Sequence, residues 1–149
     1  MKFFGHPIHA LLIHFPTALL PMDAALSFFS YYQHESLFAK AGYYCLIGAV
    51  LTGYIAMLTG LIDLLKIPRQ NKAAIASAFI HGLINGSLIL IYTVFVYKGW
   101  QLYPNISTPS ITMLFVKSIL IIILFVGNFL GGKLIYTYHI GINPPEQNG

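Results

Sequence analysis

The stretch LFAKAGYYCLIGAVLTGYIAMLTGLIDLL, residues 37–65, decides the fold, because it stays apolar over a longer distance than a bilayer is thick. Its charged residues, Lys40 and Asp63, stand close to its two ends. A membrane-spanning helix needs about 20 mostly apolar residues, each adding about 1.5 Å of length. We therefore predict that this segment is a transmembrane helix.

Three more segments satisfy the same criterion, and they run over about 7–31, 72–96 and 111–138. No alternation of polar and apolar residues competes with them, and lipid admits only helices and closed barrels. The sequence thus predicts one transmembrane domain over 1–149, an all-α integral membrane four-helix bundle. We expect up-down-up-down topology with both termini on the same side, a flexible tail over 142–149 and no internal repeat.

The composition excludes most soluble functions. The chain is 57% hydrophobic and 8% charged, whereas a soluble domain carries about 25% charged residues. The net charge of +4 is too small and too scattered to indicate nucleic acid as a partner. The single cysteine, Cys45, excludes an internal disulfide and a CxxC metal site. The partner that follows from this composition is the lipid bilayer.

The basic residues favour one orientation in the membrane. With four spans, both termini and the 66–72 loop share one side. This side carries more Lys and Arg than the other, and positively charged loops are retained in the cytoplasm. We therefore expect cytoplasmic termini. The basic residues on this side are Lys2, Lys66, Arg69, Lys72 and Lys133.

Histidines gather in the same half of the predicted bundle. The opening motif HPIHALLIHFP, residues 6–16, contains three of them. Ionisable groups inside a membrane are expensive and mark functional sites by default. We therefore expect a site here. The side chains that the predicted topology brings to this half are His6, His9, His14, Asp63, His81 and His139.

Two of these imidazoles are predicted at the same depth on separate helices. His14 and His81 both lie roughly 10–14 Å below the membrane surface, at about 1.5 Å per residue. This arrangement suits axial ligation of a b-type haem, because neutral imidazole is a good iron ligand. The haem propionates then face the basic rim formed by Lys66, Arg69, Lys72 and Lys133.

The other polar residues leave alternatives open. His6 and His9 share a helix face, but His14 is turned from His9 by roughly 140°, so the three aim at one point only if the helix bends. A transition-metal ion (Zn, Cu or Fe) held by His6, His9, His14, His81 and Asp63 is a second hypothesis. Asp63 either orients an imidazole or simply ends its helix. Asn85, one turn after His81, extends the polar stripe or bonds another helix.

Small residues and prolines shape the predicted helices. Pro16 has no amide hydrogen for the Leu12 carbonyl, so it predicts a kink close to His14. Rows of small residues let helices approach closely in lipid, and they equally provide a seat for a flat macrocycle. These rows are Gly53, Ala56 and Gly60, then Ala78, Gly82 and Gly86, then Gly127 and Gly131.

Five motifs together resemble domain of unknown function family 2231, which comprises small bacterial four-helix membrane proteins. They are HPIHALLIHFP, Asp23, GLID at 60–63, the early His81 and GGKLIY at 131–136. The resemblance implies an inner-membrane location and, because some members are fused to Rieske-type or cytochrome-type domains, redox work near the membrane. This chain departs from the family pattern at Ala10, where proline is usual, and at Tyr138-His139. The matching positions are His6, Pro7, His9, His14, Phe15, Pro16, Asp23, Asp63, His81, Gly131, Gly132 and Tyr136.

The function that these observations favour is electron transfer. We expect a membrane b-type cytochrome that binds haem b through helices one and three and exchanges electrons with a quinol or a partner protein. Such a protein is a relay rather than a self-contained enzyme. The alternatives are the transition-metal site and an accessory subunit whose histidines only hold helices together, in a homodimer or a larger complex.

Overall fold

The computed structural model describes residues 2–3, 6–138 and 140, with side chains from Ile8 onward. Its short strands β1 (Lys2–Phe3) and β2 (His6–Pro7) form a two-residue antiparallel pair. The rest of the regular structure is helical. The helices are α1 (Ile8–Leu12), α2 (His14–Gln33), α3 (Ser36–Leu64), α4 (Lys72–Leu102) and α5 (Ile111–Tyr136).

Four helices are long and apolar enough to cross a membrane, which confirms the predicted all-helical membrane class. The first span is composite, because α1 and α2 together make up Ile8–Gln33. The helix expected to end near residue 96 continues to Leu102. Lys98 and Trp100 mark where lipid contact is expected to end, but hydropathy does not fix where a helix ends. The tail predicted over 142–149 lies outside the described residues.

A break at Ile13 separates α1 from α2, as the position of Pro16 predicts. Because proline has no amide hydrogen, the Leu12 carbonyl receives no bond from Pro16. The chain nevertheless continues in nearly the same direction: the Ile13 amide donates to the His9 carbonyl at 3.1 Å. Pro21, in contrast, lies within an uninterrupted α2.

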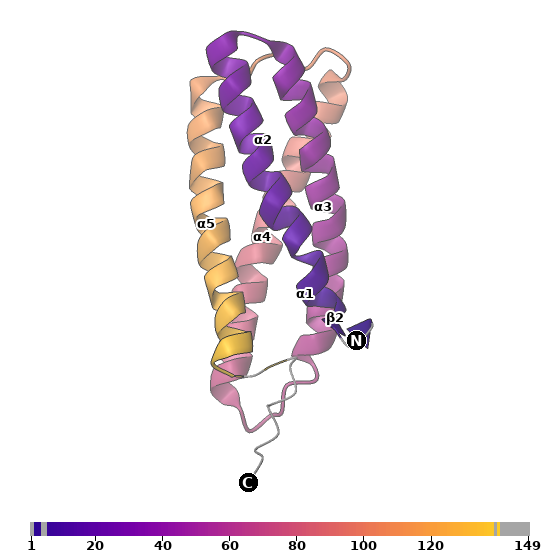
Figure 1. Cartoon of the computed structure of the whole chain (residues 1–149), viewed down its shortest axis with the longest axis vertical. Coiled ribbons are helices and arrows are strands. Elements are labelled where there is room, and N and C mark those ends of the chain that lie inside the picture. The colour runs from indigo at the N-terminus through magenta and orange to yellow at the C-terminus, as the bar shows by residue number, and fades with distance from the viewer. Residues whose placement is uncertain (1, 4–5, 139, 141–149) are drawn as a thin grey trace.

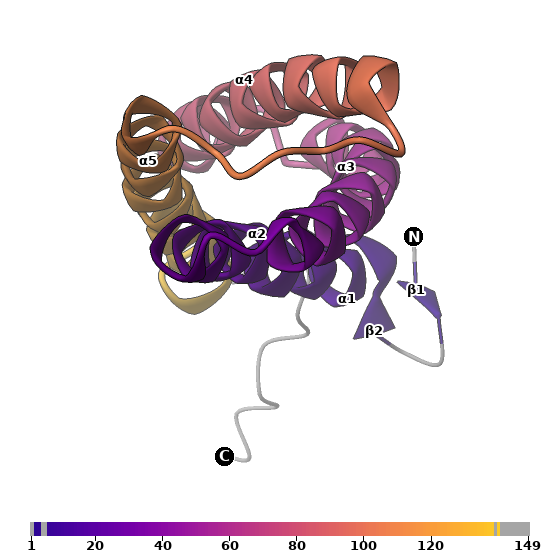
Figure 2. The same ribbon diagram turned by 90° about the horizontal axis from the view of Figure 1, so that it is seen from above.

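Seen from above, the long helices form a ring in the order α2, α3, α4, α5 (Figure 2). Consecutive long helices run in opposite directions in Figure 1. As a result α1, residues 65–71 and the last turn of α5 lie together; we call this the α1 end. The α2–α3 turn and the 103–110 connection lie at the opposite end. Side chains cap two helices, since Asn71 accepts from the Ala74 amide and Ser110 from the Met113 amide.

The core lies between the two ends, where side chains from all four spans meet. A Cβ added at Gly53 would collide with Ile89. The Ile89 side chain of α4 therefore packs directly against the backbone of α3 at Gly53. The buried residues of this cluster are Leu20, Tyr43, Leu46, Ala49, Val50, Leu88, Tyr92, Leu120 and Leu124. Toward the α1 end, glycines replace large side chains and leave room for a cavity.

Candidate functional site

His9 is held by α3. Its Nδ1 lies 2.8 Å from the Ala56 carbonyl oxygen, and because that oxygen only accepts, Nδ1 carries the proton and donates. The ring lies over Gly60, where an added Cβ would come within 2.8 Å of Cε1. Only glycine leaves room for the imidazole at this point. The seat and the hydrogen bond together fix the tautomer that keeps Nε2 unprotonated.

His81, on α4, is held by α5 in the same way. Its Nδ1 donates to the Gly127 carbonyl oxygen at 2.8 Å, and its ring lies over Gly131, where an added Cβ would come within 2.7 Å of Cε1. The side chain is 9% exposed. Asn85 Nδ2 donates to the His81 backbone carbonyl at 3.0 Å and also lies 3.2 Å from His81 Nδ1, a longer contact than the 2.8 Å from Nδ1 to the Gly127 carbonyl.

The two histidine sites are local repeats of one another, although the sequence suggested no internal repeat. IHALL at 8–12 corresponds to IHGLI at 80–84, and AMLTG at 56–60 corresponds to GNFLG at 127–131. The hydrogen-bonded partners are separated by 47 residues in the first site and by 46 in the second. The pair α1 and α3 therefore presents His9, and the pair α4 and α5 presents His81, from equivalent positions and with the same hydrogen bond from Nδ1.

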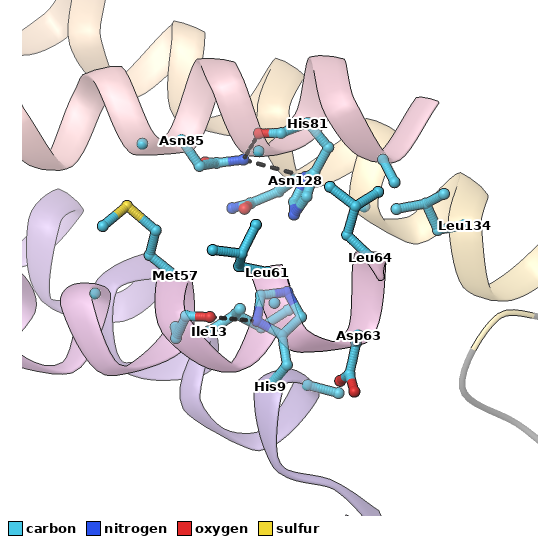
Figure 3. A pocket seen from close by; sticks show the side chains of 18 of the residues that line it. His9, Ile13, Met57, Leu61, Asp63, Leu64, His81, Asn85, Asn128 and Leu134 are labelled. Carbon is cyan, nitrogen blue, oxygen red and sulfur yellow. Dashed lines mark hydrogen bonds between the residues drawn. The ribbon is translucent and has the colours of Figure 1, made fainter. Parts of the chain in front are cut away.

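The two imidazole rings meet inside the bundle. Their centroids are 6.2 Å apart and their planes are inclined at 84°. Figure 3 shows His9 entering from α1 and His81 from α4, on opposite sides of the same space. Among the described residues, neither Nε2 has a hydrogen-bond partner. The Nε2 atoms of His9 and His81 therefore each have a lone pair available to bind a metal ion.

A cavity of about 470 Å³ surrounds the two rings and extends toward the α1 end. That volume falls within the range of about 300–1,000 Å³ typical of small-molecule and cofactor sites. Its wall on α4 is bare, because a Cβ at Gly82 would meet no atom within 4 Å. The few polar groups include Asn128, which donates to the Thr17 hydroxyl at 3.1 Å. The cavity is thus apolar, with polar groups grouped near the imidazoles (Figure 3).

The structure does not bring His14 to His81, and His9 lies opposite His81 instead. The His14 side chain is exposed, and among the described residues its Nδ1 contacts the Leu11 carbonyl of α1, at 3.3 Å. His14 does not line the cavity. Depth alone predicted the pair, but the helix face decides it, and the 140° turn between His9 and His14 puts His14 outside.

The remaining predicted site residues are more scattered. Asp63 lines the cavity near the α1 end and pairs with Lys66 at 3.1 Å. Arg69 and Lys72 are exposed, in and just after the 65–71 connection, and do not line the cavity. The side chains of His6 and His139 lie outside the described residues. Within the described part, no three His, Cys, Asp or Glu side chains gather closely enough to hold a metal ion by themselves.

A buried ion pair near the opposite end is absent from the sequence-based expectations. Lys117 Nζ lies 2.7 Å from each carboxylate oxygen of Asp23 and donates to the Ser27 hydroxyl at 2.8 Å. In the sequence, Asp23 stands out only as one of the positions that match the family motifs. Nothing in the sequence links it to Lys117, which lies 94 residues further along the chain.

The glycine seats yield a test that needs no ligand. We expect Gly131→Ala to displace the His81 ring and to lower the free energy of unfolding by about 1–3 kcal/mol, the usual result of overpacking. Gly82→Ala is the matched control on α4, because its Cβ enters open space. Alanine there should be neutral or stabilising, by up to about 1 kcal/mol of helix propensity. Denaturant titration in detergent micelles measures both, and equal stabilities would contradict the seat.

Fold and site together define a class: an integral membrane four-helix bundle that presents two fixed imidazoles to an apolar internal cavity. The chain belongs to DUF2231, a family described as "Predicted membrane protein", which matches residues 5–144. This confirms the resemblance found in the motifs. No curated protein and no solved structure matches the chain.

Proposed function

We propose that this protein is a membrane b-type cytochrome that binds haem b between His9 and His81 and relays electrons. The observation that carries the proposal is the spacing of the two rings. A bond between a metal and an imidazole nitrogen is about 2.0–2.1 Å long, and the ring centre lies about 1.1 Å behind that nitrogen. Two imidazoles on opposite sides of one metal ion therefore have centres roughly 6.3 Å apart, close to the 6.2 Å between His9 and His81.

The hydrogen bonds support the same arrangement. An axial histidine donates its Nδ1 hydrogen to a backbone carbonyl and offers Nε2 to iron. Both His9 and His81 have such a carbonyl at 2.8 Å. Rotating one ring about the axis through both Nε2 atoms leaves the spacing unchanged, so the 84° between the planes is compatible with axial ligation.

The cavity and the ligand count favour haem over a bare transition-metal ion. A small ion needs at least three or four protein ligands, and the described residues bring no third His, Cys, Asp or Glu to His9 and His81. Haem supplies four nitrogens itself and requires only the two axial ligands. The bare glycine wall and the apolar lining provide space for a flat macrocycle.

Positively charged side chains at the α1 end are placed to pair with the propionate carboxylates of a haem. The cavity reaches Ile67 in the 65–71 connection. Basic side chains in and beside this connection, Lys66, Arg69 and Lys72, are exposed and able to reach propionates. The same residues form a positive rim, for which we propose a cytoplasmic position in the bacterial inner membrane. A haem bound here would exchange electrons with a partner protein at this rim, or with a quinol within the bilayer.

An absorption spectrum tests the proposal. Detergent-purified protein should show a Soret band, with split bands appearing on reduction, and a pyridine haemochrome assay should give one haem b per chain. If the protein is expressed with haem available and shows no Soret band, the proposal fails. Elemental analysis then separates the alternatives. Equimolar metal without haem supports an ion site, whereas the absence of both metal and haem supports a structural role for the imidazoles.

A further inference from the structure

A second polar centre lies in the half of the bundle away from the histidines. From His9 to Asp23 along the first span, and from Lys117 to Gly131 along α5, the chain runs about 14 residues, roughly 21 Å. Asp23 is 2% exposed and Lys117 is 8% exposed. Both lie within helices that span the bilayer. The pair therefore forms a second site, separate from the imidazoles.

The pair is reached by a cavity of its own. A pocket of about 400 Å³ has Asp23, Ser27 and Lys117 in its wall. The same pocket is lined by Lys98 and by Ser107, Thr108 and Ser110, which lie in or next to the α4–α5 connection at the opposite end. In Figure 2 this connection crosses over the ring of helices. The lining is mostly apolar, with polar side chains both beside the α4–α5 connection and at the buried carboxylate, and we call this pocket the vestibule.

The two oxygens of Asp23 have different surroundings. Oδ1 accepts the hydrogen bond of Lys117 and faces Gly42 of α3, where an added Cβ would come within 2.9 Å. Oδ2 has the ionic contact with Lys117 but, among the described residues, no hydrogen-bond donor of its own. Asp23 is part of the vestibule wall, and the buried Oδ2 keeps a lone pair that no protein donor among the described residues occupies.

Charged and titratable side chains from α3, α4 and α5 lie around Asp23. Lys117 contacts it from α5, and Lys98 of α4 lines the same vestibule. Tyr43 of α3 lines the vestibule but donates to the Val96 carbonyl at 3.1 Å. The Tyr92 hydroxyl, buried in α4 within electrostatic range of Asp23, lacks a hydrogen-bond partner among the described residues. Asp23 is thus the one carboxylate among the described residues lining this pocket.

We propose that Asp23 is a proton-exchange site of the membrane domain, supplied through the vestibule from the side that holds the α4–α5 connection. A proton leaves hydronium in the vestibule and forms an O–H bond with Oδ2 of Asp23. Lys117 keeps its own proton, so the pair changes from neutral to a charge of +1. Ionisable residues buried in spanning helices serve as proton relays in pumps and transporters. This inference does not depend on haem.

The first experiment asks whether water reaches this depth. In a Cys45→Ser background, Phe95→Cys places a thiol on the vestibule wall, while Val94→Cys places one at the same depth on the exposed face of α4. We expect a charged, membrane-impermeant thiol reagent to modify Phe95→Cys in proteoliposomes only from the side of the α4–α5 connection. Val94→Cys should stay unmodified. Equal reaction of both variants, or of neither, would overturn the vestibule.

The second experiment observes the carboxyl group itself. Infrared spectra of reconstituted protein should show the band of a protonated carboxyl that appears as the pH on the vestibule side is lowered. The band should shift in D₂O and be absent from Asp23→Asn. Modifying Phe95→Cys with the bulky reagent should slow hydrogen–deuterium exchange of this band by an order of magnitude. Absence of any Asp23-dependent band at all pH values would show a permanently ionised structural pair and refute the proposal.

Discussion

If His9 and His81 hold haem as proposed, His9→Ala and His81→Ala are expected to lose the haem spectrum, whereas His14→Ala keeps it. Loss of a residue that merely orients a metal ligand weakens metal binding by about 10–100-fold. Removing a ligand itself should therefore weaken haem binding by at least about 100-fold. His14 is exposed and does not line the cavity, so it supplies a control from the same opening motif. Haem titration of purified variants measures the difference.

Chemical rescue separates ligation from packing. His9→Gly leaves a hole of imidazole size over Gly60, so free imidazole added to the buffer should restore the low-spin spectrum. If His9 and His81 only pack edge to face, an arrangement that aromatic rings also adopt at this spacing, imidazole would change the stability of the variant but not its spectrum. A haem spectrum that survives in His9→Ala and disappears in His14→Ala would refute the site.

The spans could be predicted from the sequence because they depend only on length and apolar content. The same reasoning placed His81, Asn85 and Asp63 in one half of the bundle, and the cavity contains all three. It selected His14 rather than His9 as the partner of His81. Counting residues gives depth to within a turn of helix, but the face that turns inward depends on the neighbouring helix. Here that face is set by Gly60 and the Ala56 carbonyl of α3.

Two signals in the sequence were overlooked. IHALL and IHGLI are similar enough to be noticed, and each is followed, after nearly the same interval, by a small residue and a glycine four positions later. The glycine rows were considered as packing or as a seat for a macrocycle, and at Gly60 and Gly131 they seat the imidazoles themselves. The Asp23–Lys117 pair had no local signal, because its partners are 94 residues apart.

The largest stability effect is expected at that pair. Removing one partner of a buried ion pair leaves an uncompensated charge and costs about 3–5 kcal/mol, whereas replacing both by apolar residues is often neutral or stabilising. Asp23→Leu and Lys117→Met should therefore each destabilise the bundle by about that amount. The double variant should recover most of the loss. Unfolding in mixed micelles that contain an increasing fraction of a denaturing detergent measures the free energy of unfolding of all three variants.

An exposed ion pair at the surface serves as the matched control for this double-mutant cycle. Lys66 and Asp63 form a pair at 3.1 Å, but the Lys66 side chain is 57% exposed. Water solvates a lysine there with or without its partner, so Lys66→Met should leave stability unchanged within error. If Lys117→Met were equally mild, water in the vestibule would already solvate Asp23 as fully as bulk solvent does. The loss on removing Lys117 thus measures how far the Asp23 carboxylate depends on the Lys117 ammonium.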